Sequence, residues 1–393
     1  MQDFYEPTAL TPMRVARLSG YIEWASQPKM FKHYPEFLFR YAFGTNKALK
    51  VLELSRTITS RTNIGGKPYN QLNTPSAGNL HPIELYVQIR AVKGLINGIY
   101  HVDAQSESIV LIREIEQDGL ESAVGMKSRF KGMLFLVSCV PFRSEWKYKE
   151  RAIRYCYLDA GHQIGAIQAS LTLHEQSMTI LSLPDTVSLN TLMGFREDEF
   201  TCCVIAVGEQ TDKSVEELKT PLMYVAPTDY CEINGFIQNL MHEEEAFSSV
   251  APLEFEVDEN MIMSRRSARQ FGNDLLQNDV YEYFMHMIKS APKILSFNII
   301  NLEDDVVRNR VSSLLIEQSF VKSAAFVCVM SAKRFGSNEL MSAGALAHQL
   351  HMYAQKMKVG FSGVGAFYDK KLQAYLQTKE YILYVCVVGT HKK

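Results

Sequence analysis

The sequence of 393 residues lacks the features that mark membrane, secreted or nucleic-acid-binding proteins. No uninterrupted apolar run reaches the roughly 20 residues that a membrane helix needs. The first nine residues carry acidic side chains and a proline, whereas a signal peptide would be basic and then apolar. The 41 basic and 43 acidic residues nearly cancel, so no net charge attracts nucleic acid. We therefore expect a cytoplasmic protein with no membrane or nucleic-acid partner.

Cysteine pairs and dinucleotide-binding glycine loops are missing as well. The seven cysteines are odd in number, form no C-x-x-C pair and lie mostly in strand-like runs such as "FLVSCV" and "YVCVV". This pattern predicts buried free thiols in a reducing compartment. The histidines lack ligand spacing against the cysteines, which argues against a zinc site. No G-x-G-x-x-G joins a strand to a helix, so a Rossmann domain is not indicated.

What the chain does contain is an internal repeat. "YLDAGHQIGAIQASLTLHEQ", which begins at Tyr157, and "LMSAGALAHQLHMYAQKMKV", which begins at Leu340, each place Ala-Gly near the start of an apolar-periodic helix. Each follows a β-rich run and precedes a strand that ends in Val-Gly. Three consecutive elements that recur at an offset of roughly 180 to 190 residues predict a duplication.

The repeat divides the chain into two halves of α+β class, each with one sheet covered by helices. The predicted halves are residues 1–225 and 251–393, and residues 226–250 form a connector whose acidic run, Glu243 to Glu245, is interpreted as a solvated helix end. The strands that we predict are Glu84–Arg90, Ile109–Ile112, Met133–Val140, Phe200–Val207, Ala324–Met330 and Tyr381–Val388. The helices that we predict are residues 48–58, Arg154–Gln176 and Ser342–Lys358.

Each half also holds a motif that the other lacks. "TPSAGNLHP", residues 74–82, puts small and polar residues before a strand, and the matching place in the second half reads "SAPKILSFNII". "SRRSARQF", residues 264–271, groups arginines and hydroxyls that suit a phosphate if the segment enters a helix. A solvated basic helix start is the alternative. If the halves pack together as a pseudo-dimer, one interface site is complete and its symmetry mate is eroded.

These motifs, together with "GFSGVGAF" and the terminal "VVG", resemble those of the nitroreductase-like flavoproteins. The first half is most similar to the SagB/ThcOx branch, whose members oxidise azolines in ribosomal peptides. The resemblance covers most of the chain. It implies tandem nitroreductase-like domains that form an intramolecular pseudo-dimer, with a single FMN between them and either a monomer or a homodimer in solution.

The resemblance also assigns residues to the cofactor. Those assigned to FMN are Arg265, Arg266, Ser267 and Arg269 at the phosphate and the flavin edge; Pro75, Ser76, Ala77, Gly78 and Asn79 against the isoalloxazine; and Gly363, Val364 and Gly365 near N5. Lys392 and Lys393 fall near the phosphate by a loose alignment. Gly78 would let the backbone approach a flat ring, and Ser76 and Asn79 would offer it hydrogen bonds. A loop without a ligand is the alternative.

Lys147 and Tyr148 are the catalytic residues that the resemblance implies. In the azoline-oxidising branch a Lys-Tyr pair supplies a base for a carbon-bound proton and a hydrogen bond to the substrate, while a hydride passes to N5. Such a lysine works if burial lowers its pKa. The alternative is an exposed charge within "SEWKYKER", where Lys149 also replaces the family's usual glycine. His81 is expected to lock its loop, and His348 and His351 to pack within a helix.

The predicted function is therefore an FMN-dependent oxidoreductase that moves a hydride between flavin N5 and an organic substrate, such as a peptide azoline or a similar heterocycle. A generalist NAD(P)H-dependent nitro or quinone reductase is one alternative, and a non-catalytic scaffold on the same fold is another. A scaffold would lose the flavin residues in both halves, whereas this sequence loses them in one site.

Overall fold

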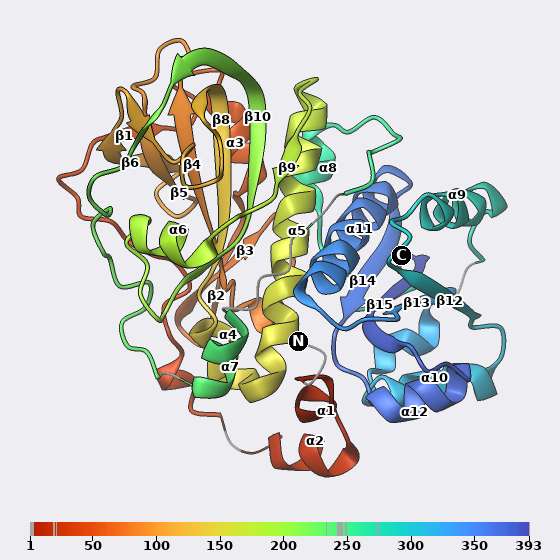
Figure 1. Cartoon of the computed structure of the whole chain (residues 1–393). Helices are drawn as coiled ribbons and strands as arrows, with labels where there is room; N and C mark the ends of the chain where they lie inside the picture. Colours follow the sequence, from red (N-terminus) through yellow and green to blue (C-terminus); the bar gives the residue numbers. More distant parts are fainter. Residues whose placement is uncertain are drawn as a thin grey trace.

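The computed structural model describes residues 4–18, 20, 22–232, 234–241, 247, 250–272 and 275–392. The predicted acidic run of the connector and Lys393 lie outside these residues. Two sheets flank a central pair of long helices, α5 (Ala152–Leu173) and α11 (Ser337–Lys356), as Figure 1 shows. The expected α+β class, with one main sheet in each half, is confirmed.

The sheet of the first half has seven strands in the order β1-β6-β5-β4-β8-β10-β9, and every neighbouring pair is antiparallel. Their bounds are β1 Arg40–Ala42, β4 Ile83–Arg90, β5 Gly98–Asp103, β6 Ser108–Glu114, β8 Ser128–Cys139, β9 Thr179–Leu181 and β10 Phe200–Ser214. Alternate side chains face opposite layers. Leu85 and Val87 pack in the cluster that contains α5 and α3 (Leu49–Ser55), and Tyr86 packs in the cluster of α6 (Thr186–Leu192).

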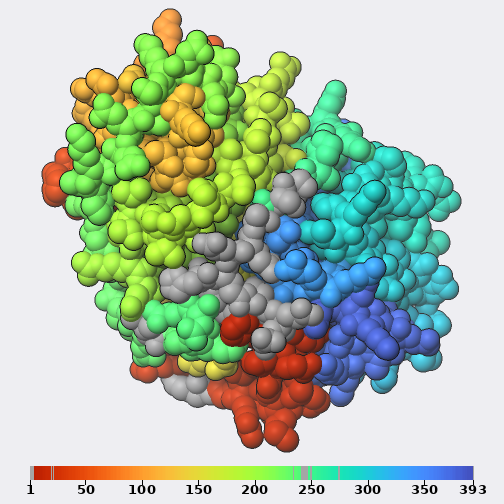
Figure 2. Space-filling view, viewed as in Figure 1, coloured from red at the N-terminus to blue at the C-terminus, as the bar shows by residue number. Residues whose placement is uncertain are grey.

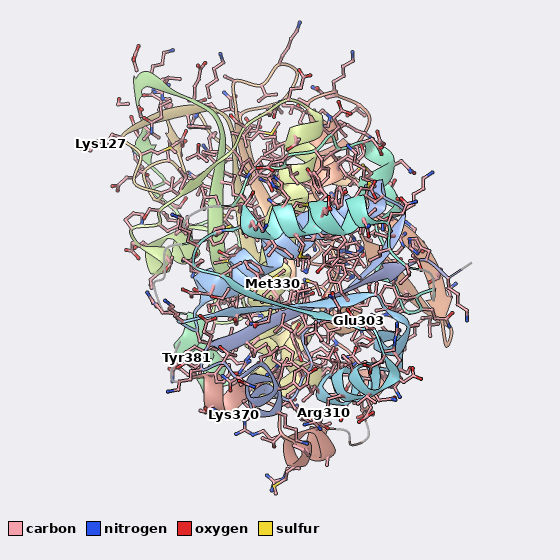
Figure 3. The ribbon with its side chains drawn as sticks, turned by 90° about the vertical axis from the view of Figure 1, so that its right-hand side faces the viewer. Lys127, Glu303, Arg310, Met330, Lys370 and Tyr381 are labelled. Atoms are coloured by element: carbon pink, nitrogen blue, oxygen red, sulfur yellow. The ribbon has the colours of Figure 1, made fainter. Side chains whose placement is uncertain are left out.

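The sheet of the second half has four antiparallel strands in the order β12-β13-β15-β14. Their bounds are β12 Ser296–Asn301, β13 Phe326–Ala332, β14 Val359–Val364 and β15 Tyr381–Thr390. Phe326 and Met330 face α11 and α9 (Asn278–Lys289), whereas Val327 and Val329 face α10 (Asp305–Leu314) and α12 (Asp369–Leu376). Figure 3 shows this sheet edge-on, with α9 on one side and α10 and α12 on the other.

The two sheets share one strand order. β4-β8-β10-β9 in the first half matches β12-β13-β15-β14 in the second, and a long helix follows the second strand of each set in chain order. A short helix, α6 or α12, then follows the third strand of each set, β9 or β14. The repeated order of strand, helix and strand that the sequence predicts is therefore present in the structure.

The Ala-Gly pairs of the repeat mark the point where α5 and α11 cross. A Cβ atom on Gly161 would lie 2.2 Å from the carbonyl oxygen of Met341, and one on Gly344 would lie 2.2 Å from that of Leu158. The two contacts are reciprocal, as in an interface with two-fold symmetry. Glycine is needed at both places because a side chain would force the helix backbones apart.

The remaining elements connect and cover these layers. They are the helices α1 Tyr5–Thr8, α2 Pro12–Leu18, α4 Phe142–Tyr148, α7 Gly235–Met241 and α8 Glu259–Ser264; the 3₁₀ turns η2 Trp24–Ser26, η3 Ala77–Asn79, η4 Lys149–Arg151 and η5 Ser319–Ser323; and the strands β2 Ile58–Ile64, β3 Lys67–Leu72, β7 Asp118–Gly119 and β11 Glu216–Glu217. No helix within the described ranges is long and apolar enough to cross a membrane.

The N-terminal segment joins the two halves at one end of the seam. Leu10 forms a bridge with Tyr368 of the second half, and the Leu10 amide donates to Asp369 Oδ2 at 2.8 Å. Arg151 of the first half donates to the Thr8 carbonyl at 2.9 Å. Figure 2 shows α1 and α2 in red against the blue second half. This segment therefore packs on both halves, although the sequence places it within the first.

Candidate functional site

A cavity of about 190 Å³ lies at the seam between the two halves. The first half contributes the 74–82 loop, the end of α4 and the start of α5, and the second half contributes the 265–271 segment, the end of β14 and Tyr384 of β15. The lining residues are Pro75, Ser76, Ala77, Gly78, Tyr148, Tyr155, Leu158, Asp159, Ser267, Arg269, Gln318, Gly363, Val364, Gly365, Ala366 and Tyr384. The structure thus brings nine of the predicted cofactor residues and Tyr148 to one cavity.

Gly78 shapes the floor of the cavity. It has φ +65°, a conformation that glycine adopts without strain. A Cβ atom here would lie 2.6 Å from the Tyr148 hydroxyl and 3.4 Å from Lys147 Nζ. The sequence predicted that the Gly78 backbone approaches a flat ring; the protein groups that it approaches in this structure are the Tyr148 hydroxyl and Lys147 Nζ.

The polar side chains of this loop bond to the loop itself and to β3. Asn79 donates to the Asn70 carbonyl at 2.8 Å, and its Oδ1 lies 2.9 Å from His81 Nε2. The Ser76 hydroxyl accepts from the His81 amide at 3.0 Å. Burial and the nearby Arg56, Arg143 and Arg265 lower the pKa of His81 to about 3, so the ring is neutral. His81 locks the loop, as expected, but Asn79 turns away from the cavity.

The arginine segment does not begin a helix. The sequence predicted a phosphate site on the condition that this segment enters a helix, and that condition is not met. It follows the end of α8 in extended form, and the Ala268 amide donates to the Phe361 carbonyl of β14 at 2.8 Å. Pairing with β14 satisfies the backbone that a helix would otherwise bond internally. Ser267 and Arg269 consequently reach the cavity.

The other two arginines point away from it. Arg265 is buried and donates to the carbonyls of Asn73 at 2.6 Å and Leu72 at 3.2 Å. Arg266 donates to the Thr59 carbonyl and hydroxyl, both at 2.6 Å. These residues tie the second half to the β2–β3 ribbon and to the loop that follows it. They are not part of the cavity wall.

The predicted "GVG" loop forms the opposite wall. A Cβ atom on Gly363 would lie 1.9 Å from the Tyr384 hydroxyl, and one on Gly365 would lie 2.6 Å from the Tyr155 ring. Arg151 donates to the Gly365 carbonyl at 2.7 Å. An arginine of the first half therefore fixes the position of a loop of the second half.

Asp369, which follows the same loop, attaches it to the first half. Its carboxylate forms ion pairs with Arg151 at 2.8 Å and with Arg154 at 2.7 Å, and all three side chains are buried. Burial alone would raise the pKa of Asp369, but the two arginines outweigh it and lower the pKa. The charged stretch after Lys147 thus supplies a buried connection between the halves.

Lys147 and Tyr148 lie at the last turn of α4. Lys147 Nζ lies 4.8 Å from the centre of the Trp24 ring, and burial lowers the pKa of this half-buried lysine. The Tyr148 ring packs edge-on against Tyr155 at 4.8 Å. Burial, Tyr155 and Asp159 raise the pKa of Tyr148, so its hydroxyl keeps its proton. Lys147 lies beside the cavity, whereas Tyr148 forms part of its wall.

Several wall residues were not predicted as site residues. Asp159 and Tyr155 belong to α5, Tyr384 belongs to β15, and Gln318 comes from the turn before η5. Asp159 had a recognisable signal, because it is the one carboxylate in the sequence of residues 152–173. The others are ordinary core residues by sequence, and the long-range packing of the halves brings them to the cavity.

Three buried histidines extend from the cavity along the α5–α11 seam. His162 Nε2 lies 3.1 Å from the Tyr384 hydroxyl, His162 and His348 pack edge-on at 5.8 Å, and His351 Nε2 lies 2.9 Å from the Arg266 carbonyl. Burial lowers the pKa of each. His348 and His351 pack within the helix as expected. Within the described part of the chain, no group of three or more His, Cys, Asp or Glu residues is arranged to hold a metal.

The geometry suits a flat polar ligand held between the halves. Glycines line two opposite walls, tyrosine hydroxyls supply neutral donors, and the exposed Arg269 adds a cation at the rim. A lysine with a lowered pKa lies next to one wall. These groups can bind and orient an uncharged ring, hold an attached anion, and exchange a proton.

The sequence and the fold were compared with known proteins. Residues 289–390 match the model of the Nitroreductase family. The trifolitoxin-processing protein TfxB of Rhizobium leguminosarum bv. trifolii is 30% identical over 188 residues, which cover 42% of this chain and 50% of that protein. A Methanocaldococcus jannaschii protein assigned as a nitroreductase is 34% identical over 92 residues, or 22% of this chain and 46% of its own length. The chain thus spans about half the length of these curated relatives.

A solved structure matches the whole chain. The crystal structure of a protein from Anabaena variabilis, assigned as a nitroreductase, superposes with a TM-score of 0.81 and 20% identity over 100% of this chain and 99% of that one. At this identity the match shows the fold. The chain therefore shares its overall α+β fold with that protein.

Proposed function

We propose that this protein is an FMN-dependent oxidoreductase that binds one FMN per chain in the cavity between its halves and moves a hydride between that cofactor and an organic substrate. The observation that carries the proposal is the cavity itself. Three motifs from distant parts of the sequence meet there: the 75–78 loop, Ser267 with Arg269, and the 363–365 loop. The Nitroreductase family match over residues 289–390 gives independent support.

The residues present fit FMN. Gly78, Gly363 and Gly365 line the cavity, and a Cβ atom on each would collide with a tyrosine of the cavity wall. Arg269 and Ser267 offer a guanidinium and a hydroxyl at one end, which suit a phosphate or a polar ring edge. Asp159 presents a buried Oδ2 atom without a hydrogen-bond partner among the described residues. Such an atom is expected where a ligand completes the hydrogen bonding.

Arg265 and Arg266 act in this proposal as positioning residues. They fix the 265–271 segment against the ribbon and the 72–73 backbone, so that Ser267 and Arg269 face the cavity. Asn79 and His81 hold the 75–78 loop in its turn. Val364 and Gly365 form the opposite wall, which Arg151 secures through the Gly365 carbonyl.

Bound FMN would supply two-electron hydride chemistry. The chain would supply the proton transfer and the orientation of the substrate. Lys147 is half-buried, and burial lowers its pKa, which favours the neutral amine that would accept a carbon-bound proton. Tyr148 keeps its phenolic proton and can donate a hydrogen bond to the substrate.

For the substrate we propose an azoline in a peptide, or a similar heterocycle, as in the SagB/ThcOx branch. The similarity to TfxB, whose name describes toxin processing, supports a peptide substrate. The matching strand orders and the reciprocal glycine contacts support an ancestral duplication that makes the chain an intramolecular pseudo-dimer, either monomeric or paired as a homodimer. The seven free cysteines favour a reducing, cytoplasmic setting.

A generalist nitro or quinone reductase is the second candidate, because the Anabaena and Methanocaldococcus relatives carry that assignment. Such an enzyme oxidises NAD(P)H, whereas an azoline dehydrogenase passes electrons from its substrate to another acceptor. Stopped-flow mixing of the FMN-loaded protein with NADPH distinguishes the two. Fast bleaching of the flavin absorbance favours the reductase, and slow bleaching favours the dehydrogenase. A non-catalytic scaffold would show neither reaction with any donor.

The proposal is tested by the absorbance spectrum of the purified protein and by FMN titration of the apoprotein. Arg269→Ala should weaken FMN binding by about tenfold or more, since it removes a charge-assisted hydrogen bond worth about 1.5–3 kcal/mol. Arg310→Ala is the matched control, because Arg310 is exposed on α10 and does not line the cavity. Equal affinity in Arg269→Ala and the unmodified protein would contradict the assignment of this cavity to FMN.

A further inference from the structure

Asp159 is a cavity residue for which neither the motifs nor the resemblance provides a role. It lies on α5, two residues before Gly161, where α5 crosses α11. Ser76 and Ala77 provide donors close enough to its carboxyl group to lower its pKa. Its Oδ2 atom is buried and has no hydrogen-bond partner among the residues described.

The surroundings of this carboxyl differ from those of the buried acids Asp369 and Glu84. Asp369 pairs with two arginines, and Glu84 pairs with Arg56 at 3.4 Å and Arg143 at 2.7 Å. Asp159 forms no ion pair with a lysine or arginine in the part of the chain that the structure describes. A buried carboxylate that lacks a cation is costly, and the usual solution is to keep the proton.

The groups that face Asp159 come from four elements. They are Tyr148 of α4, Tyr155 of α5, Tyr384 of β15 and Arg269 of the extended segment, all of which line the same cavity. Burial raises the pKa of Tyr148 and Tyr384, so these phenols stay neutral, and His162 one turn along α5 is neutral because burial lowers its pKa. Burial raises the pKa of Asp159 to about 8, against a smaller lowering by Ser76 and Ala77.

The geometry points to a specific use of this proton. We propose that Asp159 is a protonated carboxylic acid that donates a hydrogen bond from Oδ2 to an acceptor atom, a carbonyl oxygen or ring nitrogen, of the flat heteroaromatic group held in this cavity. The protein offers that proton no acceptor within the described structure, so the ligand provides it. The inference rests on the proposed function when the ligand is FMN.

The second half provides a matched control. Ser342 precedes Gly344 by two residues on α11, as Asp159 precedes Gly161 on α5. Ser342 is also buried, and its hydroxyl has no partner among the described residues. It does not line the cavity. A change there alters the same helix crossing without touching the proposed hydrogen bond.

FMN titration of the apoprotein from pH 6 to pH 9, followed by flavin fluorescence, tests the inference. In the unmodified protein the affinity should be constant at low pH and fall above about pH 8, approaching about tenfold per pH unit, because the carboxylate cannot donate. Asp159→Asn keeps a donor that does not titrate, so its affinity should stay level above pH 8. Ser342→Ala should keep the pH dependence of the unmodified protein.

Two further measurements keep the test decisive. Ser76→Ala removes one donor to the carboxyl, so it should move the fall in affinity to higher pH even if Asp159→Asn folds poorly. Infrared difference spectra of the apoprotein at pH 7, unmodified minus Asp159→Asn, should show the carbonyl stretch of a protonated carboxyl.

Three results would overturn the inference. They are a fall in affinity that persists unchanged in Asp159→Asn, a flat affinity in the unmodified protein, and the absence of the infrared band. Failure of the unmodified protein to bind FMN at any pH is a separate outcome. It overturns the proposed function together with the inference that rests on it.

Discussion

Asp369 and Asp185 occupy corresponding places in the two halves, each at the start of the short helix that follows the third strand of its set. Asp369 is fully buried and bonded to Arg151 and Arg154 from the other half. Asp185 is exposed and caps α6 through the Ser188 amide at 2.9 Å. The strands that precede them differ in the same way, since β14 is mostly buried over six residues and β9 is a three-residue edge that is partly exposed.

This difference shows how two halves with matching fold elements form a single site. The fold elements are matched in the two halves, and the glycine crossing is reciprocal. The contacts between the halves are not matched. The arginines that bond to residues 363–369 form no interaction with residues 180–185 among those described. The cavity lies at the end of the seam where these contacts are present.

The largest expected effect comes from the buried aspartate. Asp369→Asn should lower the free energy of unfolding by about 3–5 kcal/mol, because it leaves two buried arginines without their carboxylate. Asp185→Ala should cost about 1 kcal/mol, the typical value for losing an N-cap. Urea unfolding of both variants measures the contrast. Similar losses of unfolding free energy in the two variants would contradict the proposed difference between Asp369 and Asp185.

The same aspartate predicts a dependence on acid. The pKa of Asp369 is lowered in the folded protein, so its contribution to stability is present above its ordinary value of 3.8 and is lost as the pH falls below it. The unmodified protein should therefore lose stability faster than Asp369→Asn when the pH is lowered from 5 to 3. Thermal unfolding across this range provides the measurement, and parallel curves would contradict the buried ion pair.

The helix crossing should respond symmetrically. Gly161→Ala and Gly344→Ala each bring a Cβ atom to 2.2 Å from a backbone carbonyl oxygen of the other helix, so each should cost about 3 kcal/mol. The double variant should cost less than the sum, because one separation of the helices relieves both clashes. Gly235→Ala, where a Cβ atom meets nothing within 4 Å, is the control. A large cost at one glycine alone would break the pseudo-two-fold description.

Asp159 should make stability fall as the pH rises. Its pKa in the folded protein is raised from 3.8 to about 8, so the folded state holds a proton that the unfolded chain releases between these values. The slope approaches about 1.4 kcal/mol per pH unit for one proton. Asp159→Asn should flatten this slope in the apoprotein, whereas Ser342→Ala should retain it. Chemical unfolding from pH 5 to pH 8 decides between these outcomes.

A smaller effect is expected at Gly78. Gly78→Ala adds backbone strain of about 1–2 kcal/mol at positive φ and also displaces the Tyr148 hydroxyl. Gly44→Ala is the matched control, because Gly44 has φ +85° and a Cβ atom there meets nothing within 4 Å. The two variants should lose similar stability, but only Gly78→Ala should weaken FMN binding. Equal binding by both would separate Tyr148 from the site.

The sequence predicted the parts of this structure that depend on local patterns. Alternation and helical periodicity located the six expected strands and the two long helices, and the repeat was visible as two Ala-Gly helices. Some bounds were wrong, since β8 and α11 each begin five residues earlier than predicted and β10 ends seven residues later. The loop around Gly78 was noticed because it places small and polar residues before a strand, and the 363–365 loop was assigned by the family resemblance. Each of these features depends on a short stretch of the sequence.

The parts that were missed depend on long-range packing. Arg265 and Arg266 look like phosphate ligands in sequence, but the ribbon and the 72–73 backbone supply carbonyls that bind them first. Tyr384 enters the site because β15 pairs with β14, and Asp159 because α5 crosses α11. No local pattern reports which carbonyls or helices will be adjacent after folding.

The number of FMN molecules bound per chain tests the central claim most directly. Equilibrium dialysis of the purified apoprotein with FMN, with bound flavin counted by absorbance after denaturation, gives this number. The account predicts one FMN per chain, bound more weakly by Arg269→Ala and with unchanged affinity by Arg310→Ala. Two FMN per chain would mean that both ends of the seam are functional, and none would mean that the cavity serves another ligand.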